Sequence, residues 1–492
     1  MTSPSALRAR LAELDEETDA LESRLRLIAT ERGRVVDNLN SVVYPVVTLP
    51  PEITSEIFSH YILDPRLGRP RISNTPTRGP LTLAGICRSW RCICFSTNHL
   101  WASLRIYLDR SWVVDDFIHV LKCWLQCAGI DSSQCHRCNF SVIDVGRLST
   151  VKTNDWFESS AGSHPLDLHV YGYESTLSTK TLSVISQYSH QLRAFRFSID
   201  TPYSFPNEEF RGRLPLLTNL GVTILTENDT PVMVTGFRDA PQLREASLSG
   251  ASLQWISLPW IQLTHLEYSD EFMTSCLQVL HETPNLEVFD VYASYLDTGS
   301  QLPRHLTLSH LHTLRFSYDP DGELLERLVL PALKTLHLAG LRSIPSLIDL
   351  GTRSAWLLQS LCLSVMTVEN CLACLRCLSS VVEVEFQSLD SPDRDLNDLI
   401  THLHRDKTIV PALKMLAFRD CGTEFTGWQL GDMLATRASG AHDGMVKLES
   451  FRLVFSSGRR GPSKAFVQEI WEELRPAMDA GLQVRIDSPD SP

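Results

Sequence analysis

Apolar residues near the start of the chain recur at a spacing of seven. A first series runs Leu7, Leu14, Leu21, Ile28, Val35 and Val42, and a second, four residues after alternate members, runs Leu11, Leu25 and Leu39. This spacing is typical of a helix that places one apolar stripe in a coiled coil. If the first series takes the d positions, the a positions are Leu11, Thr18, Leu25, Arg32 and Leu39, so two of five are polar. We therefore predict a coiled-coil-like helix over residues 1–44, which either binds a second copy or another protein through residues 5–43 or packs against its own chain.

From about residue 187 onward, a short unit of the form apolar-x-x-apolar-x-apolar recurs. Its copies begin at Leu192, Leu217, Leu243, Leu263, Leu286, Leu311, Leu333, Leu358, Val381, Leu413 and Leu448. The first eight steps between copies are 20 to 26 residues long, which is the period of a leucine-rich repeat. In such a repeat the last two apolar positions alternate along a short strand and face the core. The pattern predicts an α/β fold in which residues 187–492 form an irregular leucine-rich-repeat solenoid, or horseshoe, with a parallel strand face.

Several segments of the predicted solenoid depart from a regular repeat. The position three residues after each strand, usually Asn or Cys, conforms only at Cys421. The last two steps widen to 32 and 35 residues, so we expect insertions near residues 390–406 and 427–443 to project as loops. A helix over 463–474 and a strand over 482–486 close the array.

Residues 108–186 are predicted to form the start of the solenoid. Alternating apolar residues indicate strands over 104–108 and 166–170, and helical spacing runs from Phe117 to Cys127. An insertion near residues 131–155 separates these elements. The pattern does not define how many repeats this part of the chain holds.

Prolines separate the first helix from a second helical segment. Pro45, Pro50 and Pro51 end the first helix, because proline lacks an amide proton and clashes with the preceding turn. Helical spacing follows at Ile53, Ile57, Phe58, Tyr61 and Ile62 and, after a loop over residues 64–80, at Leu81, Ala84, Ile86, Trp90, Ile93 and Phe95. We predict a domain of short helices over residues 45–107.

This domain resembles the F-box, the short helical motif that docks the Skp-type adaptor of cullin-RING ubiquitin ligases. The resemblance is carried by Leu49-Pro50-Pro51-Glu52-Ile53, Ile57-Phe58, Cys87-Arg88-Ser89-Trp90-Arg91 and Leu100-Trp101-Ala102-Ser103-Leu104. It covers about one eighth of the chain, and the insert at 64–80 departs from the compact motif. The resemblance implies adaptor contacts from Leu49, Pro50, Pro51, Ile53, Ile57, Phe58, Trp90 and Trp101, several of which must also build the core of the domain. The alternative is that residues 46–107 only cap the repeat array.

Composition narrows the class of partner. The chain carries 58 acidic and 45 basic side chains, a formal net charge of −13, which opposes binding to a phosphate backbone, so we expect no nucleic acid. No signal-peptide core and no apolar run near the roughly 20 residues that span a bilayer is present, so we expect no membrane association and a cytoplasmic or nuclear location. The 13 cysteines lie mostly in apolar strings and are expected to be reduced and mostly buried.

The sequence carries little that indicates catalysis. No P-loop, dinucleotide glycine motif, G-x-S-x-G or H-E-x-x-H is present. The cluster Cys135-His136-Arg137-Cys138, with Cys123 and Cys127 before it, has spacing that could hold zinc, but cysteines buried in an apolar helix are the favoured interpretation. We expect a protein that is not an enzyme, with no cofactor and no metal.

Two functions follow from these patterns. The first is a substrate-recognition adaptor of an SCF-type cullin-RING ubiquitin ligase, in which the F-box-like domain docks a Skp-type adaptor and the solenoid binds an unknown substrate protein. The alternative is a protein-interaction scaffold, unconnected with ubiquitin, that dimerises through the N-terminal helix. The substrate would be chosen by polar side chains between the apolar strand positions, such as Arg193, Arg196, Glu287, Arg315, Lys334, His337, Glu383, Glu385 and Arg419.

Overall fold

The chain forms two compact units. The computed structural model describes residues 4–41, 49–63, 71–72, 79–108, 118, 121–122, 124–125, 164–172, 177–200, 205–225, 233–251, 253–295, 305–317, 322–388, 395–423, 425–440, 444–455 and 462–487. The first unit comprises Met1–Trp101 and Cys127–Gly162, and the second comprises Ala102–Gln126 and Ser163–Pro492. The predicted insertion at 131–155 and the cysteines Cys123, Cys127, Cys135 and Cys138 lie outside the described residues.

The first unit is mostly helical where it is described. The long helix predicted at the N-terminus is confirmed as α1 (Pro4–Ser41), and the short helices follow as α2 (Pro51–Leu63), α3 (Pro80–Ile86), α4 (Arg88–Ser96) and the 3-10 turn η3 (Asn98–Trp101). The segment predicted as a loop over 64–80 contains a two-residue strand, β1 (Arg71–Ile72). A strand this short carries no apolar alternation by which the sequence could reveal it.

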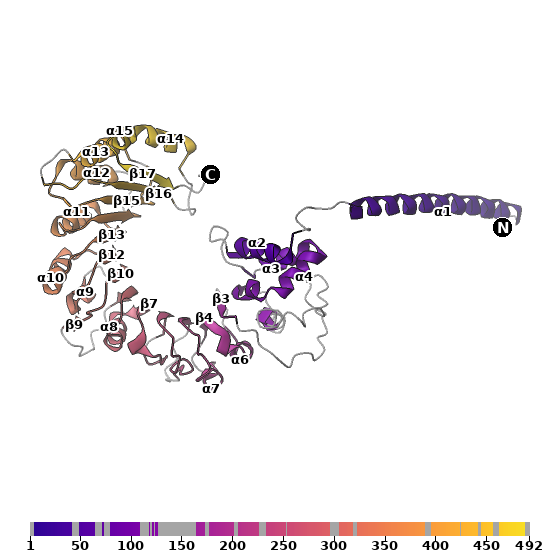
Figure 1. Ribbon diagram of the computed structural model, residues 1–492, viewed down its shortest axis with the longest axis horizontal. Helices are drawn as coiled ribbons and strands as arrows, with labels where there is room; N and C mark the ends of the chain where they lie inside the picture. Colours follow the sequence, from indigo (N-terminus) through magenta and orange to yellow (C-terminus); the bar gives the residue numbers. More distant parts are fainter. Residues whose placement is uncertain are drawn as a thin grey trace. The chain divides into compact units, whose positions relative to one another are not determined.

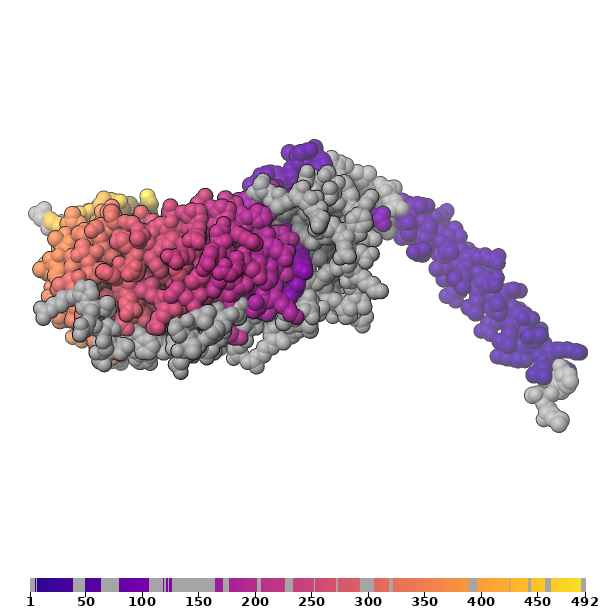
Figure 2. Space-filling view, turned by 90° about the horizontal axis from the view of Figure 1, so that it is seen from below, coloured from indigo at the N-terminus to yellow at the C-terminus, as the bar shows by residue number. Residues whose placement is uncertain are grey.

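Within the described residues of the second unit, fourteen strands form one parallel sheet in chain order. They are β2 (Ser103–Leu108), β3 (Leu166–Gly172), β4 (Leu192–Ile199), β5 (Asn219–Ile224), β6 (Glu245–Ser249), β7 (His265–Phe272), β8 (Val288–Tyr295), β10 (Thr313–Ser317), β12 (Thr335–Ala339), β13 (Ser360–Ser364), β14 (Glu383–Gln387), β15 (Met415–Arg419), β16 (Ser450–Val454) and β17 (Gln483–Asp487). A separate pair joins β9 (Leu306–Thr307) to β11 (Leu328–Val329). Figure 2 shows the sequence colours following one another in order along this unit.

The apolar positions of the repeat face inward, as predicted. One row, read strand by strand from β5 to β16, runs Leu220, Ala246, Leu266, Phe289, Leu314, Leu336, Leu361, Val384, Leu416 and Phe451. Each of these side chains is at most 5% exposed. Neighbouring strands of a sheet are about 4.8 Å apart, so such a row forms a continuous apolar core.

Helices lie on one side of the strands. They are α6 (Thr179–Ser186), α7 (Asn207–Phe210), α8 (Met273–Glu282), α9 (Glu323–Arg327), α10 (Ile344–Ser354), α11 (Val368–Cys377), α12 (Asp395–Arg405), α13 (Gly427–Ser439), α14 (Lys464–Glu473) and α15 (Arg475–Asp479). Figure 1 shows α8 to α13 along one side of the sheet, each between the strands that flank it in sequence. Parallel strands need crossover connections, and a helix commonly supplies them.

The expectation that the two wide steps project as loops was wrong. They hold helices α12 and α13, which pack against each other. In α12 the side chains of Leu399, Ile400 and Leu403 are at most 2% exposed. The extra residues therefore lengthen the helix layer, because their apolar spacing of one, three and four residues suits a buried helix face.

A left-handed residue follows five of the described strands. Gly250, Gly340, Val365, Ser388 and Asp420 have φ between 44° and 73°. In each case the amide of this residue donates a hydrogen bond to a carbonyl of the next strand in the sheet. The turn thus ends one strand while keeping its last amide paired, and glycine is the residue best suited to it.

Val365 is the least suitable residue in this series. It is β-branched, has φ of 50°, and its side chain is 45% exposed. We expect Val365→Gly to raise the free energy of unfolding by about 1 kcal/mol, since it removes backbone strain and loses little burial. Urea denaturation would measure this. Val365→Ala, which keeps the Cβ atom, should gain less, and a destabilised Val365→Gly protein would contradict the expectation.

Candidate functional site

The N-terminus of α2 is set by two prolines. Pro51 is its first residue, a position where the missing amide proton costs nothing. The carbonyl of Pro50 accepts hydrogen bonds from the backbone N and the Oγ1 of Thr54, at 3.0 and 3.1 Å. These bonds fix the direction in which α2 leaves the preceding segment.

Helix α2 carries two apolar stripes side by side. Thr54, Phe58 and Ile62, four residues apart, are 2%, 1% and 5% exposed and form the inner stripe. Ile53 and Ile57, one residue before Thr54 and Phe58, are 51% and 46% exposed, and Leu49, just before the helix, is 36% exposed. These three residues form the outer stripe. Successive helical residues are turned by 100°, so the two stripes lie on adjacent faces. The outer stripe, together with Pro50 and Pro51, presents apolar surface that the domain does not cover.

The inner stripe packs on α4. The rings of Phe58 and Trp90 meet edge to face with centroids 4.9 Å apart. Cys87 caps α4, because its Sγ accepts a hydrogen bond from the backbone N of Trp90 at 3.4 Å. The Nε of Arg91 donates to the carbonyl of Ala84 at 2.9 Å and ties α4 to α3. Trp90 is half-buried by these contacts.

Trp101 completes the core of the domain. It is 2% exposed, and its ring stacks on Phe95 with centroids 5.2 Å apart. Its Nε1 donates to the carbonyl of Cys94 at 2.9 Å. A buried indole whose polar atom is paired in this way is a structural residue.

The structure thus divides the eight residues that the sequence assigned to adaptor binding. Five are exposed and available to a partner, namely Leu49, Pro50, Pro51, Ile53 and Ile57. Phe58 and Trp101 are buried and build the core of the domain, as expected of several of these residues, and Trp90 is half-buried. Ile86, at 59% exposure, is an exposed apolar residue of α3 that we did not assign, since its helical spacing alone indicated a core position.

The exposed stripe of α2 is suited to binding rather than to reaction. Its charged neighbours include Glu56, whose Oε1 lies 3.3 Å from Nε2 of His60. A core thiol of the same unit, Cys94, is fully buried, and burial together with Cys87 raises its pKa to about 12. Such a thiol stays protonated near neutral pH and is a poor nucleophile.

A second exposed surface, which is polar, lies on the strands of the sheet. Its residues alternate with the buried strand positions. Asp290, Arg315, His337, Cys362 and Glu385 occupy neighbouring register positions on β8, β10, β12, β13 and β14. Arg315 pairs with Asp290 at 3.0 Å. Burial, followed by the charge of Arg315, lowers the pKa of His337, and burial raises that of Cys362 to about 12. The uncharged side chains of His337 and Cys362 therefore lie between the charged side chains of Arg315 and Glu385.

Further ion pairs repeat along the strands. Arg419 pairs with Glu385 at 2.6 Å, and Arg193 reaches both carboxylate oxygens of Asp167 at 2.7 and 2.9 Å. These contacts neutralise much of the mixed charge that the sequence placed at these positions. Tyr292, 52% exposed on β8, lies beside Ser269 and Ser317 in register and is a large aromatic residue that this part of the surface offers.

No protein-family model matches the chain, and no curated protein sequence matches it significantly. Among the described helices, none combines the length and apolar character needed to cross a membrane.

Proposed function

We propose that this chain is a substrate-recognition adaptor of an SCF-type ubiquitin ligase. In this proposal the outer stripe of α2 docks a Skp-type adaptor, and the strand surface of the second unit, taken as an irregular leucine-rich-repeat horseshoe, holds a substrate protein. The observation that carries the proposal is the exposure of Ile53 and Ile57 on a helix whose adjacent stripe is buried, together with the exposure of Leu49 just before that helix. The resemblance of the surrounding residues to the F-box supports the choice of partner.

The energetics favour a partner on this stripe. Burying apolar surface is worth about 25 cal/mol per Å², so three half-exposed aliphatic side chains and two prolines offer a useful contribution to binding. Exposed apolar residues that occur together, on a helix fixed by a rigid core, are typical of an interface. Because the core holds Phe58 and Trp101, the stripe keeps its shape without the partner.

The charges of the strand surface restrict the kind of substrate that it could bind. Its charges are already paired, as in Asp290 with Arg315 and Glu385 with Arg419. A partner of one strong charge would have to break these pairs, so we expect the substrate to present a polar surface of mixed charge. Tyr292 is the residue we expect to contribute most to affinity there, since exposed tyrosine is enriched among interface residues that dominate binding.

Affinity capture of the full-length chain tests the adaptor proposal. We expect wild-type protein to recover a Skp-type adaptor and a cullin, and Pro50→Ala, Ile53→Asp protein to recover neither. Ile261→Asp is a matched control, because Ile261 is 68% exposed and lies in the second unit. Equal recovery by all three proteins would overturn the proposal and leave the scaffold alternative, which the exposed residues of α1 favour.

A further inference from the structure

Helix α1 presents an apolar seam, interrupted by Thr18 and Arg32, to solvent. Every described side chain from Leu7 to Asn38 is exposed. The d-position residues Leu7, Leu14, Leu21, Ile28 and Val35 are 44% to 59% exposed, and Leu11 and Leu25 at a positions are 59% and 66% exposed. An isolated helix gains little from such a seam, and most helical stability in proteins comes from packing an apolar face. The seam therefore needs an occupant.

We propose that α1 pairs with α1 of a second copy of this chain, and that the two helices run antiparallel. Two sets of residues indicate this partner and this direction. They are the polar residues that interrupt the seam and the charged residues that flank it. Both sets of residues are poorly matched in a parallel pair and better matched in an antiparallel one.

The polar a positions disfavour a parallel pair. In parallel coiled coils each a residue faces the same residue of the second helix, so Arg32 would meet Arg32 and Thr18 would meet Thr18. In an antiparallel pair a positions face d positions. The register that centres on Leu25 opposite Leu14 also places Leu11 opposite Ile28, and Arg32 opposite Leu7 near the helix end, where its guanidinium can reach water.

The flanking charges point the same way. The g positions read Arg10, Glu17, Arg24 and Glu31, so their charge alternates. Antiparallel helices bring g against g, and the same register sets Arg10 beside Glu31 and Glu17 beside Arg24. Two-fold symmetry makes each pair twice. All four residues of this set are then matched.

A parallel pair of helices would form fewer attractive contacts between the flanking charges. There each g residue meets the e residue five positions ahead, which matches Arg10 with Asp15 but sets Glu17 against Glu22. The antiparallel register has one cost of its own, because Asp15 and Glu22 meet at e positions. Glu22 already has a cation within its own helix, since Arg26 lies 3.3 Å away.

Sedimentation equilibrium of the full-length chain, with charge exchange, tests both the pairing and its direction. We expect wild-type protein to dimerise, and Arg10→Glu or Glu31→Arg alone to weaken the dimer about tenfold, because each turns two attractive pairs into repulsive ones. The double variant should recover wild-type affinity. In a parallel dimer it would not, since residue 10 would then repel Asp15.

Two further variants make the result decisive. Leu21→Asp, Leu25→Asp should be monomeric, and Glu16→Arg, which lies at an outer f position, should dimerise as wild type does. Circular dichroism checks that α1 stays helical in each variant. Wild-type protein that remains monomeric, or a double variant that stays weakened, overturns the proposal. Neither measurement involves the adaptor, so the outcome is independent of the proposed ligase function.

Discussion

Phe58→Ala should destabilise the α2–α4 domain by about 3–5 kcal/mol, the usual cost of emptying a fully buried phenylalanine site. Phe58 is 1% exposed, and its ring is in edge-to-face contact with Trp90. The loss comes from buried area and from the cavity left between α2 and α4. Hydrogen exchange on the full-length chain would detect it as amides of α2 and α4 that exchange at least about 100-fold faster.

Ile57→Ala is the matched control for this prediction. Ile57 is the adjacent residue of the same helix and is 46% exposed. Its truncation removes little buried area, so we expect a change within about 0.5–1 kcal/mol. If both variants lost protection equally, the division of α2 into an inner and an outer stripe would be wrong.

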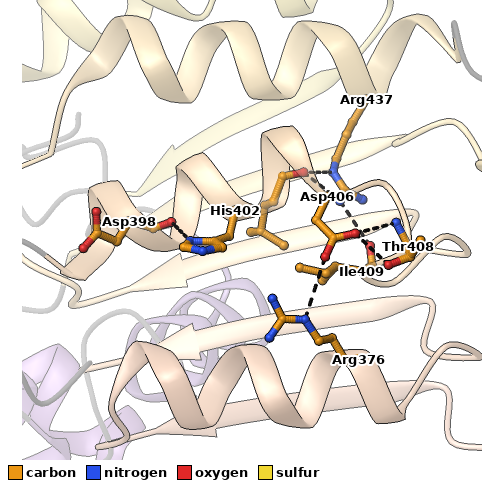
Figure 3. A network of polar contacts seen from close by, with 8 residues as sticks. Arg376, Asp398, His402, Asp406, Thr408, Ile409 and Arg437 are labelled. Carbon is orange, nitrogen blue, oxygen red and sulfur yellow. Dashed lines mark hydrogen bonds and ion pairs between the residues drawn. The ribbon is translucent and has the colours of Figure 1, made fainter.

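Arg437→Met should destabilise the C-terminal part of the sheet unit by about 2–4 kcal/mol, because it leaves two buried carbonyls unpaired. Arg437, on α13, is 4% exposed and donates from Nε and Nη2 to the carbonyl of Leu403 and from Nη2 to that of Ile409, at 2.9 to 3.1 Å. Figure 3 shows its guanidinium at the end of α12, with Asp406 and Thr408 beside it. The side chain thus closes the C-terminus of the preceding helix, where carbonyls lack partners in the helix.

Burial makes the charged form of Arg437 less favourable than it is in water. Burial lowers its pKa to about 10, and the charge of Asp406 opposes that shift only in part. The guanidinium still stays protonated at neutral pH, so the lost hydrogen bonds decide the sign of the effect. Urea denaturation followed by circular dichroism would measure it. Arg405→Met, at an exposed position of α12, is the control, and equal stability of the two variants would refute the capping role.

The sheet could be predicted because the same pattern of apolar residues recurs in every repeat. Leu336 and Leu338 alternate with polar positions along β12, and these two residues and Leu333, which precedes the strand, are at most 1% exposed. A single copy would be ambiguous between strand and helix. Eleven copies with a common order remove that ambiguity, so strand identity and inward direction followed from the sequence.

The helix layer was less accessible to sequence reasoning. The length of the two wide steps departs from the period and so predicts loops, yet Leu399 and Leu403 lie one helical turn apart and are buried. Length alone does not separate a projecting loop from a longer helix. The spacing of apolar residues does, and it was the better guide here.

The sequence located the candidate site, but it could not separate the exposed contact residues of the site from the residues that form the core. Ile57 and Phe58 are adjacent and both apolar, so no pattern tells which of them faces the core. Packing decides, because the aromatic ring fits against Trp90 while the aliphatic side chain stays outside. For α1 the heptad spacing predicts a seam with two polar interruptions, and the flanking charges indicate which partner fits it.

Titration calorimetry of the full-length chain with a purified Skp-type adaptor tests the central claim most directly. The account predicts binding with a Kd in the micromolar range or tighter, and at least about tenfold weaker binding for Ile53→Asp, whose side chain is 51% exposed and not needed by the core. Ile261→Asp should bind as wild type does. Absence of heat with wild-type protein at high concentration, or equal affinity of Ile53→Asp, would contradict the account.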